Sequence, residues 1–183
     1  MESSYIGVVG GMGPDAGINL SKNIIYNTIA TKDQDHISQI LYSSPSGISD
    51  RTDFILGKVS ENPGYQIARI LINLHSIGVG IAGLACNSAH APVIFDIITE
   101  EIKKSGIKLS LLHMIEETGY FIKTHYPSFK KIGILGTTGT FVSKQYDRLI
   151  KFGLNTINIS ASEQEKLHKA IYDPEYGVKS NPG

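Results

Sequence analysis

The chain has 183 residues, of which 41% are hydrophobic, and its 17 Lys and Arg residues balance 17 Asp and Glu residues. This composition supports a buried core and argues against intrinsic disorder. It also offers no basic excess for binding nucleic acid or an acidic membrane surface. The single cysteine excludes an intrachain disulfide, as is usual in a reducing compartment.

Strands and helices alternate along the chain, which predicts an α/β fold with parallel sheets covered by helices. The first residues, Met1–Ser4, lack a charged leader followed by an apolar run, so we expect a cytoplasmic protein. The predicted strands are residues 5–9, 37–42, 79–86, 109–112, 131–136 and 155–159. Helices are predicted from 14 to 30, from 63 to 77, after Cys86, and over 114–125, 140–152 and 162–172, before a loop-like tail at 173–183.

Two segments of the sequence resemble each other, as in an internal repeat. Residues 6–13, a strand followed by a glycine-rich turn, resemble residues 132–139, and both precede a helical pattern. A duplicated α/β unit explains this resemblance. We therefore expect a first domain over residues 1–112 and a second, truncated domain over residues 113–183 that holds two strands of its sheet.

Cys86 follows an apolar run, residues 79–85, that is typical of a central parallel strand. Ligands of open α/β sheets bind at the carboxyl ends of such strands. Because a helical pattern comes next, we expect its N-terminus to favour a thiolate at Cys86, ready to act as a base or nucleophile. A buried cysteine that serves only as a small hydrophobic residue is the alternative. A metal site formed by His75, Cys86 and His90 is also conceivable but lacks a typical ligand spacing.

Two glycine-rich turns could bind an anion. Residues 10–14 and 136–140 each place backbone N–H groups at a predicted helix start, where a carboxylate or phosphate can bind. Alternatively, these glycines only allow a strand and a helix to pack closely. A dinucleotide fingerprint also fits the first turn, but the next strand ends at Leu41–Ser44 without the acid that would hold a ribose.

Arg51 follows the loop at residues 43–50, which leaves the carboxyl end of the second strand. An arginine there could hold a carboxylate through two hydrogen bonds at the same sheet edge as Cys86. A surface arginine paired with Asp50 or Asp53 is the alternative.

Several motifs in order make the chain resemble the aspartate/glutamate racemase family, the cofactor-independent amino-acid racemases. The resemblance extends over nearly the whole chain and rests on residues 10–14, 44–52, 86–90, 136–140 and 171–179. It implies two similar three-layer α/β domains that face each other, a site in the cleft between them, and a homodimer. The family usually has threonine where this chain has Ser88, which keeps the hydroxyl.

The resemblance implies that a thiolate removes the α-proton of an amino acid and that a thiol on the opposite face returns one. Neither pyridoxal phosphate nor a metal is needed. Cys86 is the implied catalytic residue, and the substrate is aspartate or glutamate. The implied substrate-binding residues are Met12, Gly13, Arg51, Asn87, Ser88, Thr138 and Lys179.

The chain departs from the family pattern in one respect. It lacks the family's second cysteine, which belongs to a Gly-Cys-Thr-Glu-like motif, so we expect exchange of the α-proton but poor inversion. The resulting alternatives are a catalytically impaired relative that binds dicarboxylic amino acids, a cysteine-nucleophile hydrolase or maleate-isomerase-like enzyme, and a racemase for another substrate such as a hydantoin.

Overall fold

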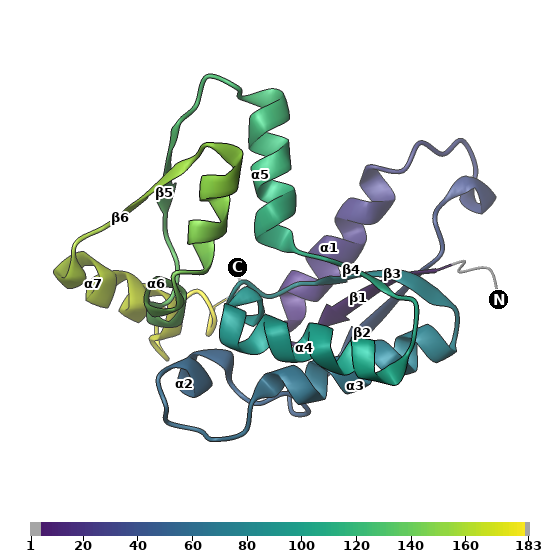
Figure 1. Cartoon of the computed structure of the whole chain (residues 1–183), viewed down its shortest axis with the longest axis horizontal. Helices are drawn as coiled ribbons and strands as arrows, with labels where there is room; N and C mark the ends of the chain where they lie inside the picture. The colour runs from purple at the N-terminus through teal and green to yellow at the C-terminus, as the bar shows by residue number, and fades with distance from the viewer. Residues whose placement is uncertain (1–4, 182–183) are drawn as a thin grey trace.

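The computed structural model describes residues 5–181, so Met1–Ser4 and the last two tail residues lie outside the described part of the chain. A four-stranded parallel sheet has the order β2-β1-β3-β4, and β5 and β6 form a separate parallel pair (Figure 1). The predicted α/β fold with parallel sheets is confirmed. The strands are β1 (Tyr5–Gly10), β2 (Gln39–Ser43), β3 (Val79–Leu84), β4 (Ser110–Leu112), β5 (Lys131–Ile134) and β6 (Asn155–Asn158).

Helices cover both faces of the larger sheet: α3 and α4 pack side by side on one face and α1 lies on the other (Figure 1). Each of these three helices has a proline in its first turn, where no N–H donor is missed. The α-helices are α1 (Pro14–Tyr26), α2 (Arg51–Ile55), α3 (Pro63–Ser76), α4 (Pro92–Ser105), α5 (Met114–His125), α6 (Thr138–Ser143) and α7 (Ala161–Tyr172). Shorter 3₁₀ segments are η1 (Asp33–Asp35), η2 (Ser88–His90) and η3 (Gln145–Phe152).

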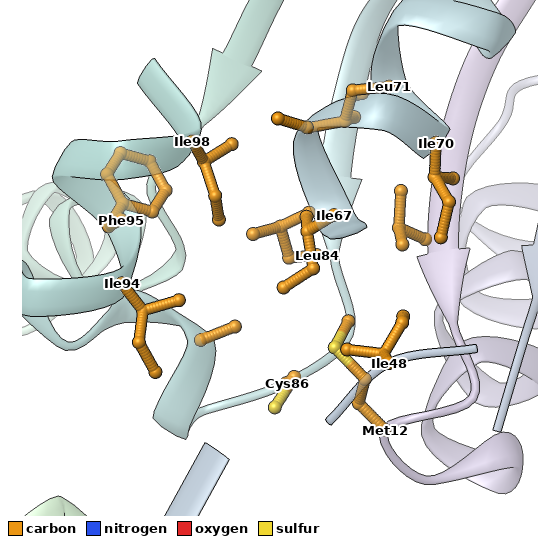
Figure 2. Packing of buried hydrophobic residues seen from close by; sticks show 14 of the residues in the cluster. Met12, Ile48, Ile67, Ile70, Leu71, Leu84, Cys86, Ile94, Phe95 and Ile98 are labelled. Carbon is orange, nitrogen blue, oxygen red and sulfur yellow. The ribbon is translucent and has the colours of Figure 1, made fainter. Parts of the chain in front are cut away.

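The main hydrophobic core lies between the larger sheet and helices α3 and α4 (Figure 2). The apolar faces of these helices supply much of it, through Ile67, Ile70, Leu71, Leu74, Ile94, Ile98 and Ile102. Ile77, directly after α3, and Val93, in the first turn of α4, are about half exposed, while Phe95 is buried. A smaller cluster beside the second sheet is formed by Ile115, Leu149 and Leu154.

Two glycines allow α1 and the loop after β2 to approach β1 closely. A Cβ at Gly10 would lie 3.1 Å from the Cα of Gly17 in α1, so the missing side chain permits helix–strand contact. Gly11 has φ +89°, and a Cβ there would meet the backbone of Ser44. These contacts bring the β1–α1 turn against the loop that leads to Arg51.

Three predicted helices have different bounds in the structure. The first ends at Tyr26 rather than at residue 30. The helix after Cys86 begins only at Pro92, because Ala91 before the proline is extended and a single 3₁₀ turn intervenes. The helix predicted over 140–152 is divided at Lys144, whose φ of 50° ends α6 and starts η3.

The strand order places the candidate residues at a switch point of the sheet. The chain passes from β1 to β2 on one side and then to β3 on the other side of β1. Ligands of doubly wound sheets bind at the carboxyl edge where the order reverses in this way. The turn after β1, which holds Met12 and Gly13, and the loop after β3, which holds Cys86, both leave that edge.

No helix within residues 5–181 is long and apolar enough to cross a membrane.

Two buried histidines pack together where β3 and β4 end. The rings of His90 and His113 have centroids 4.8 Å apart, and both contact Phe95. Neither ring nitrogen of His113 has a hydrogen-bond partner among the described residues, nor does Nε2 of His90. Burial lowers the pKa of His90, and burial together with the neighbouring His90 and Arg148 lowers the pKa of His113 to about 4.

The histidine pair predicts that acid destabilises the fold. Below pH 6.5 the unfolded chain binds protons that native His113 does not take up until about pH 4, so stability falls as pH decreases. We expect His113 alone to lower the free energy of unfolding by about 2 kcal/mol between pH 8 and pH 5. Urea unfolding at both pH values measures the loss. His113→Phe should reduce this pH dependence, whereas His125→Phe, at an exposed histidine, should leave it unchanged; an unchanged pH dependence in His113→Phe would contradict the prediction.

Candidate active site

Cys86 lies two residues beyond the end of β3 and is 8% exposed. Its side chain lies at the edge of the main core, in the same part of it as Met12 and Ile48 (Figure 2). Cys86 also lines a cavity of about 870 Å³ between α1, the end of β3 and α5. Other residues that line this cavity are Asn87, Leu20, Leu84, Leu112, Met114 and Phe121. The thiol therefore combines apolar contacts with access to a cavity at the carboxyl edge of the sheet.

A backbone loop, and not a helix N-terminus, surrounds Cys86. Because α4 starts at Pro92, the expectation that a helix N-terminus directly follows Cys86 was wrong. A hydrogen bond inside this loop stabilises it, because Nδ1 of His90 lies 2.8 Å from the carbonyl oxygen of Cys86. Since a carbonyl oxygen can only accept, Nδ1 carries the proton and donates it. His75 likewise lies with Nδ1 3.0 Å from the carbonyl oxygen of Val79. Within residues 5–181 no group of three or more His, Cys, Asp or Glu could hold a metal ion.

Arg51 is a buried cation at the start of α2, 8% exposed. Its Nη1 donates to the carbonyl oxygen of Ser49 at 3.1 Å, and its Nη2 donates to that of Met12 at 3.3 Å. Nε is buried without a partner among the described residues. Each Nη of this buried guanidinium makes one hydrogen bond to a neutral carbonyl, which leaves one N–H on each Nη for an anion.

The alternative of a surface arginine paired with Asp50 or Asp53 was wrong. Asp50 caps α2, because its Oδ1 accepts from the backbone N–H of Asp53 at 2.9 Å. The carboxylate of Asp53 pairs with Lys58 at 3.0 Å. Neither acid forms an ion pair with Arg51 in the described residues.

Arg51 lines a second cavity, of about 640 Å³, with Met12, Gly13 and Lys179. Asp15 and Asp50 also border it. Ala16, in the first turn of α1, is the residue that lines both cavities. The predicted site residues thus gather at one sheet edge but are divided between two adjoining cavities, and Ser88 and Thr138 line neither of the two.

A chain of hydroxyl contacts connects Lys179 with α2. Nζ of Lys179 lies 4.2 Å from the ring centroid of Tyr172 and donates to its hydroxyl at 3.1 Å. The Tyr172 hydroxyl in turn donates to Oγ1 of Thr52 at 3.3 Å, and Oγ1 of Thr52 lies 3.5 Å from Oγ1 of Thr137. These contacts hold the tail segment of Lys179 over the cavity of Arg51.

Asn87 makes contacts that sequence reasoning missed. Its Oδ1 accepts from Nε2 of Gln145 at 2.7 Å and from the Tyr146 hydroxyl at 3.0 Å. Its Nδ2 donates to Oγ1 of Thr140 at 3.3 Å. Nothing in the sequence around Lys144 signals the break that presents Gln145 and Tyr146 to this loop.

Thr138 is the first residue of α6, two residues before the predicted helix start, and its backbone N–H already has a partner. It donates to Nδ1 of His168, in α7, at 3.3 Å. Ser88 is buried in η2. The role of both residues in binding a substrate stays a prediction.

Comparison with known proteins places this chain in a family. A family model described as Asp/Glu/Hydantoin racemase matches residues 9–180. The structure is similar to that of an aspartate racemase from Picrophilus torridus, with 30% sequence identity and a TM-score of 0.74 over 92% of this chain and 66% of that one. An aspartate racemase homologue from Pyrococcus horikoshii OT3 has a similar fold, with 21% identity and a TM-score of 0.69 over 93% of this chain and 70% of that one.

The chain therefore spans just under two thirds of the length of the Picrophilus racemase. The family match covers both glycine-rich turns, Arg51, the loop of Cys86 and the tail as far as Lys179. These are the segments that line the two cavities or adjoin them. The chain belongs to the Asp/Glu/hydantoin racemase family.

Proposed function

We propose that this protein binds a dicarboxylic amino acid, aspartate or glutamate, and that Cys86 removes its α-proton without pyridoxal phosphate or a metal. The observation that carries the proposal is the placement, in adjoining cavities at one sheet edge, of a cavity-lining thiol and a buried guanidinium that lacks an acidic partner in the described residues. Membership of a racemase family and the name of the Picrophilus protein support this class of substrate.

In this proposal, binding energy comes from the carboxylates. Arg51 pairs with the side-chain carboxylate through the donors that the carbonyls of Ser49 and Met12 leave available. Lys179, at the rim of the same cavity, adds a second positive charge. The α-carboxylate then lies toward Cys86 and Asn87, on the other side of Ala16.

The chemical difficulty is the weak acidity of the α-proton. Removing it places negative charge on the α-carbon and, by delocalisation, on the α-carboxylate oxygens. In this proposal the N–H of the Asn87 amide that Thr140 leaves free stabilises that charge as it develops. The Cys86 thiolate takes the proton and becomes a thiol, and the same thiol can return either that proton or one exchanged with water.

Returning the proton to the same face restores the starting enantiomer, whereas inversion needs an acid on the opposite face. Cys86 is the single cysteine of this chain. We therefore propose that the 183-residue chain exchanges the α-proton faster than it interconverts the enantiomers. The second candidate function is binding of dicarboxylic amino acids without turnover. The presence of a single cysteine favours it too, because inversion needs a second acid on the opposite face.

The test compares two rates in deuterated buffer. NMR follows loss of the α-proton signal of L-aspartate and L-glutamate, and chiral chromatography follows formation of the D-enantiomer. We expect exchange to exceed inversion by about a hundredfold or more, because positioned acid–base groups contribute factors of that size. Binding without exchange above a protein-free blank would leave only the second candidate.

A further inference from the structure

The amide of Asn87 is fixed in one orientation by Gln145, which is fully buried. Nε2 of Gln145 lies 2.9 Å from the backbone carbonyl oxygen of Asn87, a group that can only accept. The atom of Gln145 that faces this carbonyl is therefore its NH₂ group. Since that NH₂ also lies 2.7 Å from the Asn87 side chain, the atom that it meets there is the oxygen, Oδ1.

Further contacts reinforce this assignment. Oε1 of Gln145 lies 3.1 Å from the hydroxyl of Ser143, which shares its hydrogen between this oxygen and the carbonyl oxygen of Thr140 at 3.2 Å. The Tyr146 hydroxyl donates to the same Oδ1 at 3.0 Å. Burial raises the pKa of Tyr146, which keeps its hydroxyl protonated and able to donate at neutral pH.

The hydrogen-bonding capacity of Asn87 can then be counted. Oδ1 accepts two hydrogen bonds and has no lone pair left for a ligand. Nδ2 uses one hydrogen on Oγ1 of Thr140 and keeps the other. The side chain of Asn87 can therefore donate one hydrogen bond to a ligand in the adjoining cavity and accept none.

We infer that Gln145 is a positioning residue that makes Asn87 a donor-only group, so that this part of the site selects a hydrogen-bond acceptor such as a carboxylate or enolate oxygen. The inference rests on the proposed function for the identity of the ligand, but the orientation of the amide does not depend on it. The break at Lys144, which divides the predicted helix, is part of this arrangement because it presents Gln145 and Tyr146 to Asn87.

Two substitutions at Gln145 separate orientation from packing. Gln145→Met keeps most of the volume but removes both donors, so the Asn87 amide can rotate. Gln145→Glu places a carboxylate against Oδ1 and the carbonyl oxygen of Asn87, which drives the NH₂ group of Asn87 toward the new acid and Oδ1 toward the ligand. Gln39→Glu is the matched control, because Gln39 lies at the opposite end of the sheet and donates to the carbonyl oxygen of Ser21.

Calorimetry with succinate measures the effect on binding. We expect the affinity to fall about tenfold in Gln145→Met and about a hundredfold in Gln145→Glu, while Gln39→Glu stays within about twofold of the wild type. Thermal unfolding identifies any variant that does not fold. An equal affinity in all four folded proteins would overturn the inference.

A spectroscopic readout separates this inference from the proposed function. The side-chain amide resonances of Asn87, assigned by their loss in Asn87→Ala, are expected to shift in the ligand-free Gln145 variants and not in Gln39→Glu. If wild-type protein neither binds succinate nor exchanges the α-proton but these shifts occur, the proposed function fails and the positioning role stands. If the resonances of Asn87 do not move when Gln145 is replaced, the positioning role is wrong whatever the activity.

Discussion

Replacing Cys86 by alanine is expected to reduce the rate of α-proton exchange from aspartate by about a thousandfold, since a positioned base contributes factors of roughly 10² to 10⁴. The side chain lines the cavity at the carboxyl end of β3, within the region enclosed by α1 and α5. In the described residues no other thiol can replace it, because the chain has one cysteine. Proton NMR in deuterated buffer gives the rate directly.

Two further measurements distinguish loss of a base from loss of a fold. Cys86→Ser keeps the size of the side chain but replaces the thiol by a far less acidic hydroxyl, so we expect exchange to fall almost as far as in Cys86→Ala. Succinate binding by both variants should stay within about threefold of wild type, because the carboxylate contacts are made by other residues. Exchange at the wild-type rate in Cys86→Ala would end the proposed role of the thiol.

The single cysteine also permits a chemical test of its location. Iodoacetamide can modify this chain at one thiol only, and mass spectrometry counts the adduct. A bound dicarboxylate that fills the cavity should slow this modification. Modification at the same rate with and without aspartate, at a concentration that saturates binding, would place the thiol away from the ligand.

Replacing Arg51 by methionine is expected to weaken the binding of aspartate and succinate by about a hundredfold. The guanidinium is buried, and removing one partner from a buried charged pair costs about 2–5 kcal/mol. The free amino acid alanine lacks the second carboxylate, so Arg51→Met should bind it with nearly the wild-type affinity. The substitution therefore changes ligand selectivity as well as affinity. Isothermal calorimetry with the three ligands measures both effects.

The arginine series has its own controls. Arg51→Lys keeps the charge but loses the planar fork, and we expect it to bind aspartate with an affinity between those of wild type and Arg51→Met. Arg69→Met removes an exposed arginine from α3 and should leave all three affinities unchanged. An Arg51→Met protein that binds aspartate as tightly as the wild type would exclude the guanidinium from the site.

Local patterns in the sequence were sufficient for the six strands, for most of the helices and for their order, but not for α2. Prolines before apolar periodicity predicted the starts of α1 and α3, and a non-alternating apolar run predicted β3 as a buried parallel strand. Since parallel strands present their carboxyl ends at one edge, the placement of Cys86 and Arg51 at that edge followed from the chain order alone. These features depend on neighbours a few residues apart, which is why a single sequence contains them.

The tertiary structure alone decided how the site residues are held. Arg51 is buried against the carbonyl oxygen of Met12, 39 residues away, and the amide of Asn87 is oriented by Gln145, 58 residues away. No periodicity encodes such contacts, and the left-handed backbone at Lys144 that permits the second one has no glycine or asparagine to mark it. The division of the predicted residues between two cavities has the same origin. A cavity is bounded by side chains from distant segments, here α1, the loop after β3 and α5 for one and the β1–α1 turn, Arg51 and the tail for the other. The sequence thus determined which groups reach the sheet edge, and long-range packing determined their burial, orientation and free hydrogen-bonding capacity.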